Sequence, residues 1–128
     1  MKKLPKKSRI FKSAWFQRFA KREKITDDFL ENAVSDAEKG LIDADLGGNV
    51  IKQRISRQGQ GKSGGYRTII FFKEGEKAFF IYGYAKNARE NIDKNELKAF
   101  KEAAKEMLKL SDEQIEQLVQ TNDLTEVL

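Results

Sequence analysis

Residues 61–84 decide the fold and read GKSGGYRTIIFFKEGEKAFFIYGY. Two apolar runs, Tyr66–Lys73 and Lys77–Tyr84, flank the short polar turn Glu74-Gly75-Glu76. Thr, Ile, Phe and Tyr favour strands, and a short linker that contains glycine joins antiparallel strands, so the pattern predicts a β-hairpin. Because nearly every residue of both runs is apolar, we expect this part of the sheet to be covered on much of both faces.

Helical and strand patterns alternate around this hairpin. Two capping boxes, Asp93 with Glu96 and Ser111 with Gln114, mark helix starts. The glycine-rich segment Arg57–Gly65 is expected to be a loop. In chain order, the predicted elements are a strand at Arg9–Ser13, helices at Ala14–Lys24 and from the N-cap Thr26 to Gly40, a strand at Val50–Ile55, the hairpin, helices at Lys94–Leu110 and from Ser111 to Gln120, and a last strand at Leu124–Leu128.

The element order, β-α-α-β-β-β-α-α before that last strand, predicts an α+β fold. Short hairpin links make the sheet mainly antiparallel, and the helices pack on it in a two-layer sandwich. A chain of 128 residues is long enough for one hydrophobic core. We expect a single domain over residues 9–128, preceded by a basic flexible tail over residues 1–8.

The composition removes several kinds of chemistry. Cysteine and histidine are both absent, which excludes disulfides, thiolate zinc sites and a histidine general base. The usual metal ligands are therefore missing as well, and we expect no metal site. No apolar run approaches the roughly 20 residues of a membrane span, and none follows the basic start of the chain as in a secretory signal. The sequence predicts a cytoplasmic protein without a membrane partner.

The net charge of +5 is arranged in blocks. Residues 1–24 and 51–73 are strongly basic, and the second block contains six Lys or Arg residues and no acid. Residues 25–50 are acidic. Such blocks favour a basic face for a polyanion. The alternative is a solvated surface with an uneven charge distribution.

Positive side chains lie at the start of the first hairpin strand and directly after the end of the second. Arg67 opens the first strand after the loop that carries Lys62, and Lys86 and Arg89 follow the second strand. Two adjacent strands that end in positive charge form a surface suited to phosphate. The alternatives are an Arg67 paired to Glu74 or Glu76, and an ordinary polar loop at residues 86–89.

Further candidates for a nucleic-acid surface come from strands beside this cluster. Lys52 and Arg54 share the open face of the strand at Val50–Ile55, although charge on such a face is common in any protein. Tyrosine rings stack on unpaired RNA bases, but they also pack in cores and at sheet edges. The candidate tyrosines are Tyr66, Tyr82 and Tyr84.

Three segments together resemble the RelE/HigB superfamily of toxins, and most closely its HigB-like branch in type II toxin–antitoxin systems. They are Asp43–Gly48 (DADLGG), Gly59–Arg67 (GQGKSGGYR) and Phe80–Asn87 (FIYGYAKN). The resemblance extends over residues 9–128. Its specific parts are the Gly-Tyr-Arg strand start and the lysine after the next strand.

This resemblance implies an mRNA interferase that needs no metal and no cofactor and acts on messenger RNA in the A site of the small ribosomal subunit. The RNA 2′-OH attacks its adjacent phosphate, leaving a 2′,3′-cyclic phosphate and a 5′-OH. It also implies a cognate antitoxin, commonly a helix-turn-helix DNA-binding protein in the HigB-like branch. Arg67 then clamps the transition state, and Lys62, Lys86 and Arg89 approach the same phosphate. One of the lysines is a candidate general acid or base.

The chain departs from the better-studied RelE pattern at two positions. Asn87 stands where those members carry an arginine, and Ile92–Lys94 stands where they carry a tyrosine. Histidine, which other branches supply, is absent. The assignment of the general acid and base therefore does not carry over. Two other functions stay open: a ParE-like inhibitor of DNA gyrase on the same fold, and an RNA-binding module without catalysis.

Overall fold

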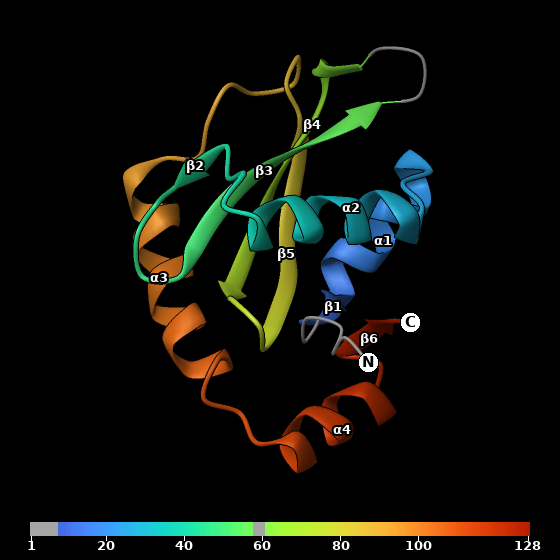
Figure 1. Cartoon of the computed structure of the whole chain (residues 1–128), viewed down its shortest axis with the longest axis vertical. Helices are drawn as coiled ribbons and strands as arrows, with labels where there is room; N and C mark the ends of the chain where they lie inside the picture. The colour runs from blue at the N-terminus through green and yellow to red at the C-terminus, as the bar shows by residue number, and fades with distance from the viewer. Residues whose placement is uncertain (1–7, 58–60) are drawn as a thin grey trace, which may run out of the picture.

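A computed structural model describes residues 8–57 and 61–128, with their side chains except those of residues 57 and 61–64. Within these residues a six-stranded sheet forms the centre of the molecule, with the order β2-β3-β4-β5-β1-β6 (Figure 1). Neighbouring strands are antiparallel except β1 and β5, which are parallel. The strands are β1 (Arg9–Ser13), β2 (Ala44–Asp45), β3 (Val50–Arg57), β4 (Gly61–Lys73), β5 (Lys77–Ala85) and β6 (Leu124–Val127).

The predicted hairpin is confirmed as β4 and β5, with Gly75 in the turn at a φ of 74°. The predicted loop at Arg57–Gly65 is wrong at both ends, because β3 continues to Arg57 and β4 already begins at Gly61. Arg57 and Gly61 are paired beyond a register shift that follows Ile55. Backbone pairing needs no side chain, so the strands run on through glycine-rich sequence. Residues 58–60 lie outside the described residues.

Two helices cover one face of the sheet (Figure 1). Helix α1 (Ala14–Glu23) begins where the side chain of Ser13 accepts a hydrogen bond from the Phe16 backbone N–H. Helix α2 (Asp27–Glu38) begins after the predicted N-cap Thr26 and carries two acids in its first turn, where the helix dipole favours them. Their apolar sides pack on alternate residues of the middle strands, among them Ile51, Ile70, Phe72 and Phe80.

Helices α3 (Lys94–Met107) and α4 (Asp112–Gln120) pack on the opposite face. Both predicted capping boxes are present, with Asp93 and Ser111 as the N-caps. Their apolar residues meet the other set of strand residues, among them Val50, Ile69, Phe71 and Phe79. The α+β class and the mainly antiparallel sheet are confirmed. Helices on both faces add a third layer to the two that the element order predicted.

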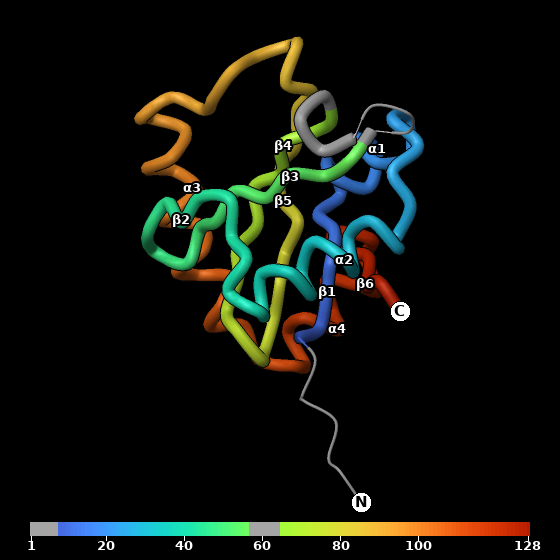
Figure 2. Tube along the Cα trace, turned by 45° about the horizontal axis from the view of Figure 1, so that its top comes forward, coloured from blue at the N-terminus to red at the C-terminus, as the bar shows by residue number. Residues whose placement is uncertain are grey.

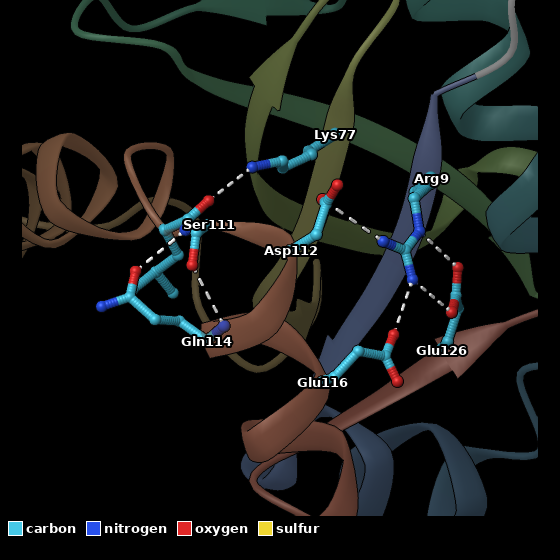
Figure 3. A network of polar contacts seen from close by, with 8 residues as sticks. Arg9, Lys77, Ser111, Asp112, Gln114, Glu116 and Glu126 are labelled. Carbon is cyan, nitrogen blue, oxygen red and sulfur yellow. Dashed lines mark hydrogen bonds and ion pairs between the residues drawn. The ribbon is translucent and has the colours of Figure 1, made fainter.

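Strands β1 and β6 and helix α4 are joined by the side chain of Arg9 (Figure 3). Its guanidinium donates to both carboxylate oxygens of Glu126, at 2.9 and 2.8 Å, and to Glu116 at 3.1 Å. Asp112 lies 3.7 Å from the same group. These hydrogen bonds, first of all those to Glu126, raise the pKa of Arg9. The C-terminal strand, predicted at Leu124–Leu128, is thus confirmed and held by charge as well as by backbone pairing.

We expect Arg9→Met to lower the free energy of unfolding by about 1–2 kcal/mol, because a forked pair to a half-buried carboxylate is lost. Urea unfolding measures the change. The control is Arg18→Met, since Arg18 is exposed and has no ion pair within the described residues, and it should stay within about 0.5 kcal/mol of wild type. Equal midpoints for the two variants would contradict the importance of the Arg9 contacts.

Candidate functional site

A row of polar side chains crosses the three middle strands near one end of the sheet. Arg54 of β3 pairs with Arg67 of β4, which pairs with Tyr84 of β5. The next row contains Lys52, Ile69 and Tyr82. Cross-strand partners point to the same face of a sheet. Ile69 packs in the cluster with α3 and α4, so both rows lie on that face.

A β-bulge brings the two tyrosines to this face. In β5 the register shifts so that Phe80 pairs with Ile70 and Tyr82 pairs with Ile69, which leaves Ile81 as the extra residue. Phe80 therefore packs towards α1 and α2, whereas Tyr82 packs towards α3. Without the bulge, strict alternation would keep both tyrosines on the face of Phe80. The Ser13 hydroxyl donates to the Ile81 carbonyl at 3.1 Å and holds the bulge beside the start of α1.

The exposed fraction of the residues in the first row falls from β3 to β5. Arg54 is exposed, Arg67 is 8% exposed and Tyr84 is 4% exposed. Arg67 lies six residues from Lys73 at the hairpin turn, about 20 Å along an extended strand, so Glu74 and Glu76 are remote from it. A guanidinium at this depth, beside a second arginine, forms a concentrated positive site for an anion.

Tyr84 contributes a buried hydroxyl. Its Oη has no hydrogen-bond partner among the residues whose side chains the structure describes. Burial raises the pKa of Tyr84, while the positive charges of Arg67 and Arg89 act in the opposite direction. The hydroxyl is thus protonated near neutral pH and available to donate a hydrogen bond.

The segment between β5 and α3 arches beyond the end of β5 in both views (Figures 1 and 2). Within it, Arg89 donates to both carboxylate oxygens of Glu96, at 2.5 and 3.1 Å, and to the Tyr82 hydroxyl at 3.2 Å. Its guanidinium carbon lies 5.9 and 5.6 Å from the ring centres of Tyr82 and Tyr84. Arg89 therefore holds this segment against both tyrosines.

The pair with Arg89 lowers the pKa of Glu96 from 4.5 to about 2. A lowered pKa stabilises the fold above pH 4.5, and this stabilisation is lost as the pH falls from 4.5 towards 2. We therefore expect Glu96→Gln to destabilise the protein at neutral pH, and the difference from wild type to shrink below about pH 4.5. Urea unfolding at about pH 7 and about pH 3.5 measures it. A difference that is constant between the two pH values would contradict the pairing.

Trp15 is a site residue that sequence reasoning missed, because its spacing places it with the apolar residues of α1. The residue is 38% exposed, and its ring lies 4.6 Å from the Tyr82 ring and 5.3 Å from the Phe19 ring, centre to centre. A half-exposed indole beside a polar row is a surface on which an unpaired base can stack.

Not every predicted residue comes to this site. Tyr66 is buried on the opposite face, where its hydroxyl donates to Glu23 at 2.9 Å. Lys86 is exposed in the turn directly after β5, and its backbone N–H donates to the Gly65 carbonyl. The side chain of Lys62 lies outside the described residues. Lys52 donates to Asn91 at 3.4 Å, which connects β3 to the segment before α3.

Asp43 is the acid nearest to the outer end of the row. One of its carboxylate oxygens accepts the backbone N–H of Arg54, and the other lies 3.7 Å from the Arg54 guanidinium. Arg54 is therefore partly neutralised, and an incoming anion has to compete with Asp43 for it.

Two searches of the described residues give negative findings. Residues 8–57 and 61–128 contain no group of three or more Asp and Glu side chains arranged to hold a metal ion. None of the helices described is long and apolar enough to cross a membrane.

A comparison with models of protein families finds a match. The family model described as RelE toxin of the RelE/RelB toxin–antitoxin system matches residues 8–127. No curated protein matches the chain.

Proposed function

This chain belongs to the RelE toxin family, and on that basis we propose that it is a ribosome-dependent endoribonuclease that cuts messenger RNA in the ribosomal A site. Membership makes it the toxin of a toxin–antitoxin pair, so its partner is an antitoxin. The observation that carries the proposal is the row Arg54, Arg67 and Tyr84 on one face of the sheet. The HigB-like branch and a helix-turn-helix antitoxin stay predictions from the sequence.

In the proposed reaction the 2′-oxygen of the message attacks the adjacent phosphorus, and the bond from phosphorus to the 5′-oxygen breaks. The 2′-hydroxyl loses a proton and the departing 5′-oxygen gains one, so the products are a cyclic phosphate and a 5′-OH. Negative charge grows on the non-bridging oxygens in the transition state. The fork of Arg67 matches two of these oxygens, and its burial strengthens the attraction.

The neighbours of Arg67 have distinct proposed roles. The protonated Tyr84 hydroxyl donates to the same phosphate, which supplies the partner that it lacks among the described side chains. Arg54 and Lys52 bind phosphates on either side of the cut. Lys86, at the rim, is the candidate for proton transfer.

Two further groups orient the substrate and the site. Trp15 and Tyr82 offer a stacking surface for a base next to the cut, because the indole is partly exposed and rests on the tyrosine ring. Arg89 is a positioning residue, since its guanidinium is already bonded to Glu96 and Tyr82. A contact from Lys62 to RNA stays a prediction.

Expression in cells, with and without the antitoxin gene, tests the proposal. We expect growth arrest that the antitoxin relieves, together with new 5′ ends within translated messages. Intact messages accompanied by trapped gyrase–DNA cleavage complexes would contradict the proposal and favour the gyrase inhibitor. RNA binding without arrest or cleavage would favour the non-catalytic module.

A further inference from the structure

Helix α3 carries a row of four lysines that the site described above does not use. Lys94, Lys98, Lys101 and Lys105 stand at positions i, i+4, i+7 and i+11, here called the lysine ridge. At 3.6 residues per turn they fall within about 60° of the helix circumference. Two acids of the helix, Glu96 and Glu106, lie well outside that sector. Glu102 borders it, because it stands four residues after Lys98 and three before Lys105, and it lines the same surface hollow as the four lysines.

The ridge charges take little part in stabilising the fold, apart from Lys105, which lies in the last turn of α3 where the helix dipole favours a cation. Lys94, Lys98 and Lys105 are exposed, and no member of the ridge has an ion pair within the described part of the chain. Lys94 also opens the helix, where the positive end of the dipole disfavours a cation. Four unpaired cations in one row instead favour an external polyanion.

The ridge has a fixed place beside the sheet. Its start is held by the Asp93–Glu96 capping box and by the pair between Arg89 and Glu96. Further along, Lys101 lies over the turn between β2 and β3, since a Cβ added at Gly48 would be 3.2 Å from Lys101 Cγ. The helix backbone therefore fixes the spacing of the four lysines, while the exposed side chains stay free to reach phosphates.

The ridge also continues the candidate site. Lys52 of the second polar row bonds to Asn91, three residues before Lys94. From there the ridge extends for about 16 Å at 1.5 Å per residue, enough for several phosphates of one strand. It offers no aromatic side chain that could read a base. A strand held at Arg67 can therefore leave the site along α3 by backbone contacts alone.

Resting on the proposed function, we propose that the lysine ridge is a phosphate track for the single-stranded message that leaves the cleavage site. The contacts are charge contacts and carry no sequence preference. They lengthen the RNA footprint beyond the cut codon and make binding depend steeply on salt.

The test compares two variants that each lose three positive charges. The ridge variant is K94Q/K98Q/K105Q, which retains the packed Lys101, and the control is K21Q/K39Q/K73Q, with exposed lysines on other elements. The probes are labelled single-stranded RNAs of about 4 and about 12 nucleotides. Each carries 2′-O-methyl groups, which remove the attacking hydroxyl. Fluorescence anisotropy gives Kd at several KCl concentrations.

For the longer RNA, we expect the slope of log Kd against log salt to fall by about 2 in the ridge variant, at about 0.7 per lost phosphate contact. The control variant should keep the wild-type slope, and the short RNA should bind both variants alike. Equal slopes for ridge and control variants would overturn the proposal. An equal fall of the slope for a 12-base-pair RNA duplex would also overturn it, because the ridge would then bind structured RNA. Message cleavage by wild type on ribosomes is measured separately. A failure of the proposed nuclease activity is thereby distinguished from a failure of the proposed phosphate contacts.

Discussion

Replacement of Arg67 by alanine is expected to lower message cleavage by about 10²–10³-fold, the usual effect of removing one preorganised donor to transition-state charge. Arg67 lies 8% exposed between Arg54 and Tyr84, so a phosphate bound there is shielded from water on the sheet side. Arg67→Lys should also be strongly impaired, because lysine keeps the charge but not the planar fork. Single-turnover cleavage on programmed ribosomes measures both variants.

Lys73→Ala is the matched control for Arg67, because Lys73 is an exposed cation at the other end of the same strand. It should cleave like wild type. Urea unfolding and antitoxin binding check that the Arg67 variants are folded. A folded Arg67→Ala protein that cleaves as fast as wild type would remove Arg67 from the proposed mechanism.

Gly83→Ala is expected to destabilise the protein by about 1–3 kcal/mol through overpacking. Gly83 faces α1, and a Cβ there would lie 2.6 Å from Phe19 Cε2 and 3.2 Å from Phe16 Cε2. Both rings belong to the buried core, so neither has free space into which to move. A shift of α1 would also change the contact between Trp15 and Tyr82. Urea unfolding measures the stability.

A double-mutant cycle identifies the cause of the Gly83 effect. Phe19→Leu removes the ring that the new methyl group would meet, so Gly83→Ala should cost less in that background than in wild type. If the two substitutions change the free energy of unfolding additively, the close approach to Phe19 is not the cause of the destabilisation by Gly83→Ala.

Local signals predicted most of the elements. The apolar runs around Glu74-Gly75-Glu76 gave the hairpin, and Asp93 and Ser111 marked helix starts that the structure has at the same positions. These features depend on neighbours within a few residues, so the sequence contains them fully. The apolar hairpin strands predicted cover on both faces of the sheet, which the structure has. Which face each helix covers depends on contacts distant in sequence, so the element order predicted two layers instead of three.

The composition of the site was harder to predict because it depends on one inserted residue. Arg67, Tyr82 and Tyr84 share a face only because of the bulge at Ile81, and no residue type marks that bulge in the sequence. Tyr66, next to Arg67, points to the other face by ordinary alternation. Trp15 reaches the site from the start of α1, directly after β1, and a helical spacing pattern does not reveal its contact with Tyr82.

The most direct test of the nuclease proposal is primer extension on a defined message in a translating extract, with purified wild-type protein or Arg67→Ala, and with or without ribosomes. The proposal predicts new 5′ ends that keep to the reading frame, require ribosomes and disappear with the variant. A message that stays intact in the presence of folded wild-type protein and translating ribosomes would contradict it.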